Sequence, residues 1–116
     1  MQRLKRRQDF IAAAKAVSQG TPGFLLQARL RADDAPARVG FTCSKKLGNA
    51  VARNRIKRRL KEAVRLSFAA VARPSYDYVL IGRSAAATRG FEILQQDLIS
   101  AASRLHGKAA QPMEKQ

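Results

Sequence analysis

Apolar and polar positions follow strand periodicity in three segments of the chain. Alternate positions from Phe24 to Leu30 are apolar, which predicts a strand with one buried face. Val39–Cys43 indicates a second strand, and the turn residues 33–36 separate the two. Tyr76–Gly82 is a nearly continuous apolar run, which is typical of a strand buried on both faces.

Three other segments carry apolar residues at helical spacing. The first runs from about Arg7 to Val17 and is rich in alanine. The longest runs from about Ala50 to Ala72 and stops before Pro74, because the residue before a proline disfavours helix. Thr88 can cap a last helix over residues 89–105.

These elements predict an α+β protein, in which a small sheet has helices packed mainly on one side. The 116 residues suffice for a single compact domain with one modest core. We expect this domain to span residues 1–106. Residues 107–116 are expected to form a disordered polar tail.

The charge points to a polyanionic partner. Lysine and arginine number 23 against 8 acidic residues, a formal net charge of +15. Nucleic acid is the favoured partner, and a membrane surface is disfavoured because no run approaches the ~20 apolar residues of a spanning helix. Cys43 is the single cysteine, so an intramolecular disulfide and a cysteine-rich zinc site are excluded, which fits the reducing cytoplasm.

The positive charge is concentrated in the longest helix and the segment before it. On a helical wheel the apolar residues share one sector, and most basic residues lie opposite or on its flanks. A solvated face usually mixes signs, whereas this one places like charges side by side, which costs stability unless a polyanion compensates. The segment 45–65 carries Glu62 and nine basic residues: Lys45, Lys46, Arg53, Arg55, Lys57, Arg58, Arg59, Lys61 and Arg65.

No constellation of catalytic or metal-binding residues stands out. Asp9, Glu62 and Asp77 are isolated in sequence, and His106, the single histidine, is expected at the surface near the end of the last helix. A protein nuclease usually needs clustered carboxylates or a histidine pair. We therefore expect no catalytic residue, no metal ligand and no cofactor in the protein.

The stretch from Arg38 to Ala63, RVGFTCSKKLGNAVARNRIKRRLKEA, closely resembles the signature of the bacterial ribonuclease P protein family. The hallmark is Arg-Asn-Arg within Gly-Asn-Ala-Val-x-Arg-Asn-Arg-x-Lys-Arg, here Gly48–Arg58. A basic opening with a phenylalanine-bearing helix (residues 3–10) and Tyr-Asp-x-Val (residues 76–79) also match. The resemblance covers roughly residues 3–105.

The resemblance implies a compact αβββαβα domain, ribosomal protein S5 domain 2-like, with a left-handed βαβ crossover around the Arg-Asn-Arg helix. The usual right-handed rule argues against that crossover, so the residues alone could not have indicated it. The resemblance also implies a short extra strand near residues 18–23.

The function implied is that of the RNA-binding protein subunit of ribonuclease P, the ribonucleoprotein endoribonuclease that removes the 5′ leader from precursor tRNA. Catalysis is then expected in the RNA subunit, with Mg²⁺. The expected partners are that catalytic RNA, bound one to one, and precursor tRNA, in the cytoplasm and without a membrane.

Two RNA-facing surfaces are implied for the family. The Arg-Asn-Arg region and Lys45-Lys46 lie near the RNA subunit, and a cleft between the first helix, the sheet and the long helix receives the single-stranded leader. A second aromatic residue of the family's first helix is replaced here by Ala14. The RNA-binding residues expected are Lys45, Lys46, Arg53, Asn54, Arg55, Lys57, Arg58, Arg59, Lys61 and Arg65. The leader cleft is expected to contain Phe10, Arg53, Asn54, Lys57 and Lys61.

Two other functions fit a basic, non-catalytic protein. A general RNA-binding or ribosome-associated protein without a role in tRNA processing would leave the Gly48–Arg58 motif unexplained. A DNA-binding protein would place the long helix in a major groove, but no helix-turn-helix precedes that helix. Preference for duplex DNA over tRNA-like substrates would favour the latter.

The charge pattern predicts that affinity for RNA falls steeply with salt. If about six phosphates are neutralised, the plot of log affinity against log salt has a slope several units negative. Filter binding across a salt series measures it. A slope near zero would show that the basic helix is not the interface.

Overall fold

The computed structural model describes residues 1–109 and contains one five-stranded sheet in the order β1-β4-β5-β3-β2. Two short 3-10 turns, η1 (Lys45–Leu47) and η2 (Ser84–Ala87), join larger elements. The strands and helices in chain order are β1 (Gln2–Arg3), α1 (Arg7–Ala14), β2 (Val17–Gly20), β3 (Phe24–Leu30), β4 (Arg38–Cys43), α2 (Ala50–Ser67), β5 (Tyr76–Gly82) and α3 (Phe91–Ala109).

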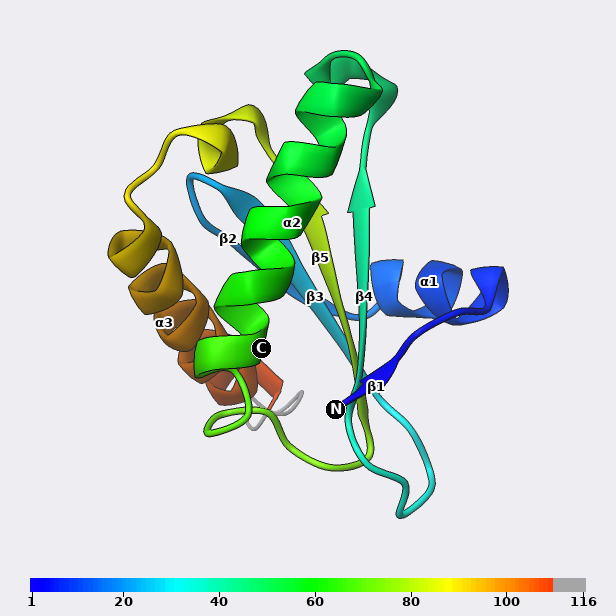
Figure 1. The fold of residues 1–116 in the computed structure, drawn as a ribbon. Coiled ribbons are helices and arrows are strands. Elements are labelled where there is room, and N and C mark those ends of the chain that lie inside the picture. The colour runs from blue at the N-terminus through cyan, green and yellow to red at the C-terminus, as the bar shows by residue number, and fades with distance from the viewer. Residues whose placement is uncertain (110–116) are drawn as a thin grey trace.

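The sheet is mixed, and its parallel half contains the unusual connection. β3 runs antiparallel to β2 and β5, whereas β4 runs parallel to β5 and to β1. In Figure 1 the chain leaves β4, descends through α2 in front of the sheet and enters β5 on the left of β4. With both strands pointing upward this crossover is left-handed, as the family resemblance implied and against the usual preference.

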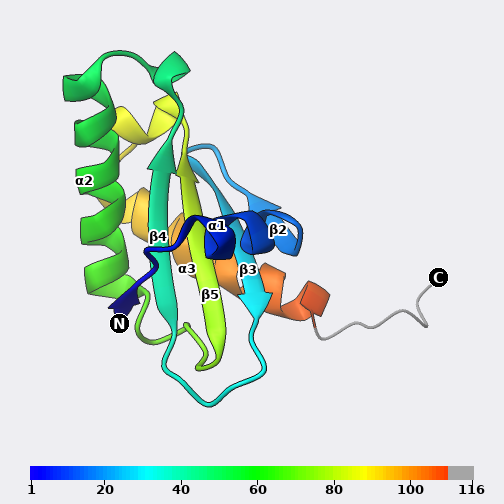
Figure 2. The same ribbon diagram turned by 90° about the vertical axis from the view of Figure 1, so that its right-hand side faces the viewer.

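Helices cover both faces of the sheet. Figure 2 shows α1 across one face, with α2 and α3 on the opposite side. Strand alternation divides the side chains: Tyr78 and Leu80 enter the main core beneath α2 and α3, while Val79 joins the small core beneath α1. The expected α+β class is confirmed, with β1 as an additional edge strand.

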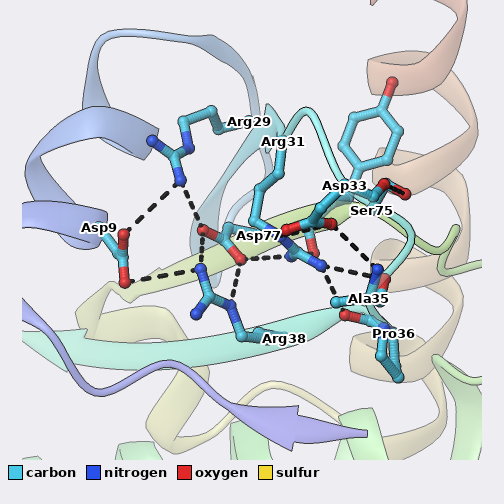
Figure 3. A network of polar contacts seen from close by, with 10 residues as sticks. Asp9, Arg29, Arg31, Asp33, Ala35, Pro36, Arg38, Ser75 and Asp77 are labelled. Atoms are coloured by element: carbon cyan, nitrogen blue, oxygen red, sulfur yellow. Dashed lines mark hydrogen bonds and ion pairs between the residues drawn. The ribbon is translucent and has the colours of Figure 1, made fainter.

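A buried carboxylate ties α1 to the sheet. Asp77 in β5 is fully buried and accepts hydrogen bonds from Arg31 (2.6 Å), Arg38 (2.7 Å at each oxygen) and Arg29 (3.2 Å). Figure 3 shows Asp9 of α1 on the far side of this cluster, 3.6 Å from Arg29 and 3.5 Å from Arg38. The two arginines therefore bridge a helix carboxylate and a sheet carboxylate.

The pKa of Asp77 reflects these partners. Burial alone would raise the pKa, but the hydrogen bonds from Arg38 and Arg31 outweigh it, so the pKa lies below the ordinary carboxyl value. The carboxylate stays charged in the interior because arginines neutralise it. Removing one partner of such a buried pair typically costs about 3–5 kcal/mol.

Several element boundaries differ from the sequence prediction. α2 ends at Ser67 rather than Ala72, because Phe68 turns inward and packs edge-on against Tyr78 with ring centroids 4.8 Å apart. α1 ends at Ala14, and β2 begins at Val17, where the predicted helix would have completed a third turn.

The last helix is also displaced relative to the prediction. Thr88 ends the η2 turn instead of capping the helix, and Gly90 accepts the first helical hydrogen bond from Leu94. α3 continues to Ala109, so the first three residues of the expected tail are helical. The rest of that tail lies outside the described residues.

His106 is buried, and the expectation of a surface histidine is wrong. It is 4% exposed, and its Nε2 lies 2.8 Å from the Tyr78 hydroxyl. That hydroxyl accepts from the Arg73 backbone N–H (2.9 Å), so its own proton is free to be donated to Nε2. Burial, with Arg73 nearby, lowers the pKa of His106, and the ring joins α3 to β5 as the neutral form.

The single histidine predicts a pH dependence of stability. Because the folded-state pKa of His106 is lowered, the unfolded chain takes up a proton first. The stabilisation that neutral His106 gives the folded protein is therefore present above about pH 6.5 and is lost as the pH falls below that value. The free energy of unfolding, measured with urea at several pH values between about 8 and 5, should fall with pH in wild type. It should change less with pH in His106→Gln. Equal curves would contradict the assignment.

Candidate nucleic-acid interface

α2 presents its charges along defined flanks because its apolar face is fixed by the core. Asn49 caps the helix, its side chain accepting from the Ala52 N–H at 2.9 Å. Ile56, Leu60 and Ala63 are buried, as the helical wheel predicted. The basic residues are thereby distributed over a flank facing β4, a flank facing η2 and the outer surface between them.

The flank facing β4 carries a row of cations one helical turn apart, Arg53, Lys57 and Lys61, which we call the β4-side row. The Lys61 Nζ lies 6.0 Å from the centroid of the Phe41 ring in β4. Lys57 and Arg53 act on Cys43 at the end of the same strand: burial raises the pKa of that thiol, and these two charges oppose the rise. Within residues 1–109, no carboxylate forms an ion pair with the row.

The flank facing η2 has a structural role that the sequence did not indicate. Arg59 donates to the backbone carbonyls of Ala86 (2.6 Å) and Arg89 (2.7 Å), and its guanidinium lies 5.9 Å from the Phe91 ring centroid. Arg55 donates to the Ala87 carbonyl at 3.2 Å. The two arginines hold the turn that leads into α3, so two of the five N–H donors of Arg59 are engaged within the protein.

The remaining predicted residues lie at the outer surface. Lys45 and Lys46 form the exposed η1 turn beside the N-terminal end of α2, and Asn54 and Arg58 are exposed on α2 itself. Arg65 forms an ion pair with Glu62 one turn earlier, which reduces its free charge.

A hollow of about 360 Å³ lies between α1 and the sheet, and we call it the Phe10 hollow. The Phe10 ring packs over Gly40, where an added Cβ would come within 2.5 Å of the ring. Phe10 also contacts the small core of Leu4, Ala13 and Val79, so it is both a core residue and a wall of the hollow. The hollow is lined by Arg7, Phe10, Ala14, Gln27, Phe41, Thr42, Val79 and Ile81.

The predicted cleft residues are therefore divided by a strand. Phe10 lies on the α1 face of the sheet, whereas the β4-side row lies on the α2 side. Between them runs β4, whose pairing with β1 covers Arg38 and Val39 and ends there. Phe41 lines the hollow on one side and meets Lys61 on the other.

Phe41, which lines the hollow, was not among the residues expected from the sequence. Strand alternation places Phe41 on the inward face of its strand, as observed. Alternation does not show that the pairing of β4 with β1 ends at Val39. An aromatic residue inside a strongly basic segment was the available signal.

Most acidic side chains in the described part of the chain form ion pairs with arginine. Asp9, Asp33 and Asp77 belong to the cluster around Arg31 and Arg38, and Asp97 pairs with Arg89. Within residues 1–109, no three metal-binding side chains come together. In the same range, no helix is long and apolar enough to cross a membrane.

Comparison with known proteins gives a consistent family. The family model described as Ribonuclease P matches residues 1–106. The ribonuclease P protein component of Ruegeria pomeroyi is 56% identical over 106 residues, covering 89% of this chain and 85% of that protein. The structure of Staphylococcus aureus RNase P protein matches with a TM-score of 0.73 at 28% identity, over 90% of this chain and 94% of that one. The RNase P protein from Thermotoga maritima matches with a TM-score of 0.74 at 26% identity, over 90% and 97%.

The geometry of α2 predicts that Arg59 stabilises the fold. Arg59→Ala removes two charge-assisted hydrogen bonds to carbonyls and should lower the free energy of unfolding by roughly 1.5–3 kcal/mol. Arg58→Ala removes the same charge from the outer surface and should change it by less than about 0.5 kcal/mol. Urea denaturation measures both. Equal stabilities would show that the carbonyl contacts contribute little.

Proposed function

The chain belongs to the bacterial ribonuclease P protein family, and from this premise we propose that it binds the 5′ leader of precursor tRNA beside β4 and the catalytic RNA around the N-terminal end of α2. It is the protein subunit of ribonuclease P, a ribonucleoprotein endoribonuclease of tRNA 5′ maturation, and it associates with ribonuclease P RNA.

Leader binding is supported chiefly by the pairing of an aromatic hollow with unneutralised cations. Phe10 gives the hollow an aromatic wall, and the β4-side row adds positive charge across the strand. Aromatic stacking combined with phosphate neutralisation grips single strands with little sequence preference. That property suits a leader, whose sequence differs from one precursor to the next.

Binding of the catalytic RNA is assigned to the exposed residues around the start of α2. Lys45, Lys46, Asn54 and Arg58 lie on the outer surface, and Arg55 lies at its edge with part of its guanidinium engaged by Ala87. This surface supplies phosphate donors and one amide for a sugar or base edge. We propose a one-to-one complex in the cytoplasm, in which the RNA performs hydrolysis with Mg²⁺.

A general RNA-binding role is the alternative, and it predicts no preference for a leader. Under that alternative the basic residues of α2 act as one electrostatic surface. The two models therefore differ in how substitutions on different flanks affect different RNAs.

Paired substitutions on α2 separate the models. Lys57→Ala with Lys61→Ala should weaken binding of precursor tRNA by roughly 0.5–1.5 kcal/mol per residue, because each removes a partly exposed phosphate contact. Binding of mature tRNA and assembly with the RNA subunit should be nearly unchanged. Arg55→Ala with Arg58→Ala should instead weaken assembly. Arg58 is chosen over Arg59 because Arg59 makes two hydrogen bonds to the turn before α3, whereas Arg55 makes one and Arg58 lies at the outer surface.

The measurement is equilibrium binding at fixed salt, with and without a leader, to the reconstituted complex. Arg104→Ala, an exposed charge on α3, serves as the control for loss of net charge alone. If both pairs weaken leader-bearing and mature tRNA equally, α2 is one undivided surface and the two-surface proposal fails.

A further inference from the structure

A second hollow lies on the α2 side of β4, and Lys61 is the one predicted cleft residue that lines it. It measures about 430 Å³ and runs between the N-terminal strand, β4 and the C-terminal half of α2; we call it the α2 groove. Its floor is apolar, formed by Val39, Phe41 and Val64. Its rim carries Arg3 and Lys61.

The α2 groove and the Phe10 hollow share one lining residue. Phe41, whose ring is half-buried, lines both of them and lies beyond the two residues of β4 that pair with β1. A single strand leaving the Phe10 hollow across this part of β4 would meet the Phe41 ring next. Ala14 leaves Phe10 as the one aromatic on the α1 wall of the first hollow, so Phe41 is the second aromatic surface on this path.

The charge of the groove fits a phosphate backbone. Lys61 lies 6.0 Å from the Phe41 ring centroid, within reach of the phosphate of a base stacked there. Arg3 stands at the opposite rim and also lines a third hollow with Lys5 and Arg6 at the start of α1. Within residues 1–109, no carboxylate forms an ion pair with Arg3, Lys5 or Arg6.

We propose that the α2 groove binds the leader nucleotides beyond those in the Phe10 hollow, with Phe41 as a stacking surface and Arg3 and Lys61 as phosphate contacts. This inference rests on the proposed leader-binding function. The catalytic RNA is assigned to the N-terminal end of α2, and the groove lies along the C-terminal half of that helix. A leader that extends from the catalytic RNA along the protein therefore reaches the Phe10 hollow first and the α2 groove afterwards.

The test is a series of precursor tRNAs whose leaders are lengthened one nucleotide at a time, bound to the reconstituted complex at fixed salt. Phe41→Leu keeps an apolar side chain against the core but removes the ring, and Arg3→Ala removes a rim charge from an exposed position. Each should leave the affinity gain from the first leader nucleotides intact. Each variant should reduce the further gain in affinity that longer leaders give. For Phe41→Leu, which removes the stacking surface, we expect a reduction of about tenfold.

Two controls separate the proposal that the α2 groove binds the leader from the proposal that the protein binds the leader at all. Phe10→Ala should remove the gain from the first nucleotides, and Arg104→Ala on α3 should leave the whole series unchanged. If the longer leaders gain as much in Arg3→Ala and Phe41→Leu as in wild type, the groove is not a leader site. If wild type shows no gain from any leader, the leader-binding function itself is wrong.

Discussion

The buried carboxylate of Asp77 is the interaction on which the arrangement of the molecule depends. It lies in the central strand β5, on the face covered by α1, and is fully buried. An unpaired charge there would be very costly, so the site requires cations from neighbouring strands. Arg29 in β3 and Arg38 in β4 supply them on both sides and extend to Asp9 in α1. The cluster thus fixes the two strands beside β5 and the helix above them.

This cluster also explains how a short helix can hold the ring of Phe10, the proposed stacking surface, in place. α1 has eight residues, no side-chain cap and a small core beneath it. Isolated helices of that length are unstable in water. The ion pairs of Asp9 add an attachment one residue before Phe10, and Gly40 lets the Phe10 ring approach the sheet. The Phe10 hollow is consequently formed by the fold itself.

Sequence reasoning succeeded where a local pattern determines the structure. Strands over residues 24–30 and 76–82 were predicted with their observed limits, because alternation and continuous apolarity are set by burial along the strand itself. The buried stripe of α2 followed from helical periodicity for the same reason. The left-handed crossover came from the family resemblance, since handedness depends on packing that periodicity does not encode.

The errors concern residues whose partners lie far away in sequence. His106 is buried because the Tyr78 hydroxyl, 28 positions earlier, receives it. Arg59 contacts carbonyls about 30 positions later, and Asp9 and Asp77 share Arg29 of β3 and Arg38 of β4. In each case composition marked the residue as exposed or isolated. The structural partner of each residue lies too far away in the sequence for a local pattern to reveal it.

The same contacts sort the positive charge into two populations. Arginines that meet carboxylates or carbonyls, such as Arg31, Arg38 and Arg59, are consumed in holding the fold. Most of the described acidic residues form ion pairs with arginines of this kind. Few acidic residues therefore remain to neutralise the other lysines and arginines. Within residues 1–109, Lys57, Lys61 and Arg3 form no ion pair with a carboxylate, and approaching phosphates would relieve their mutual repulsion. The ion pairs that stabilise the domain thereby also leave its free charge beside β4, where we propose that a single strand binds.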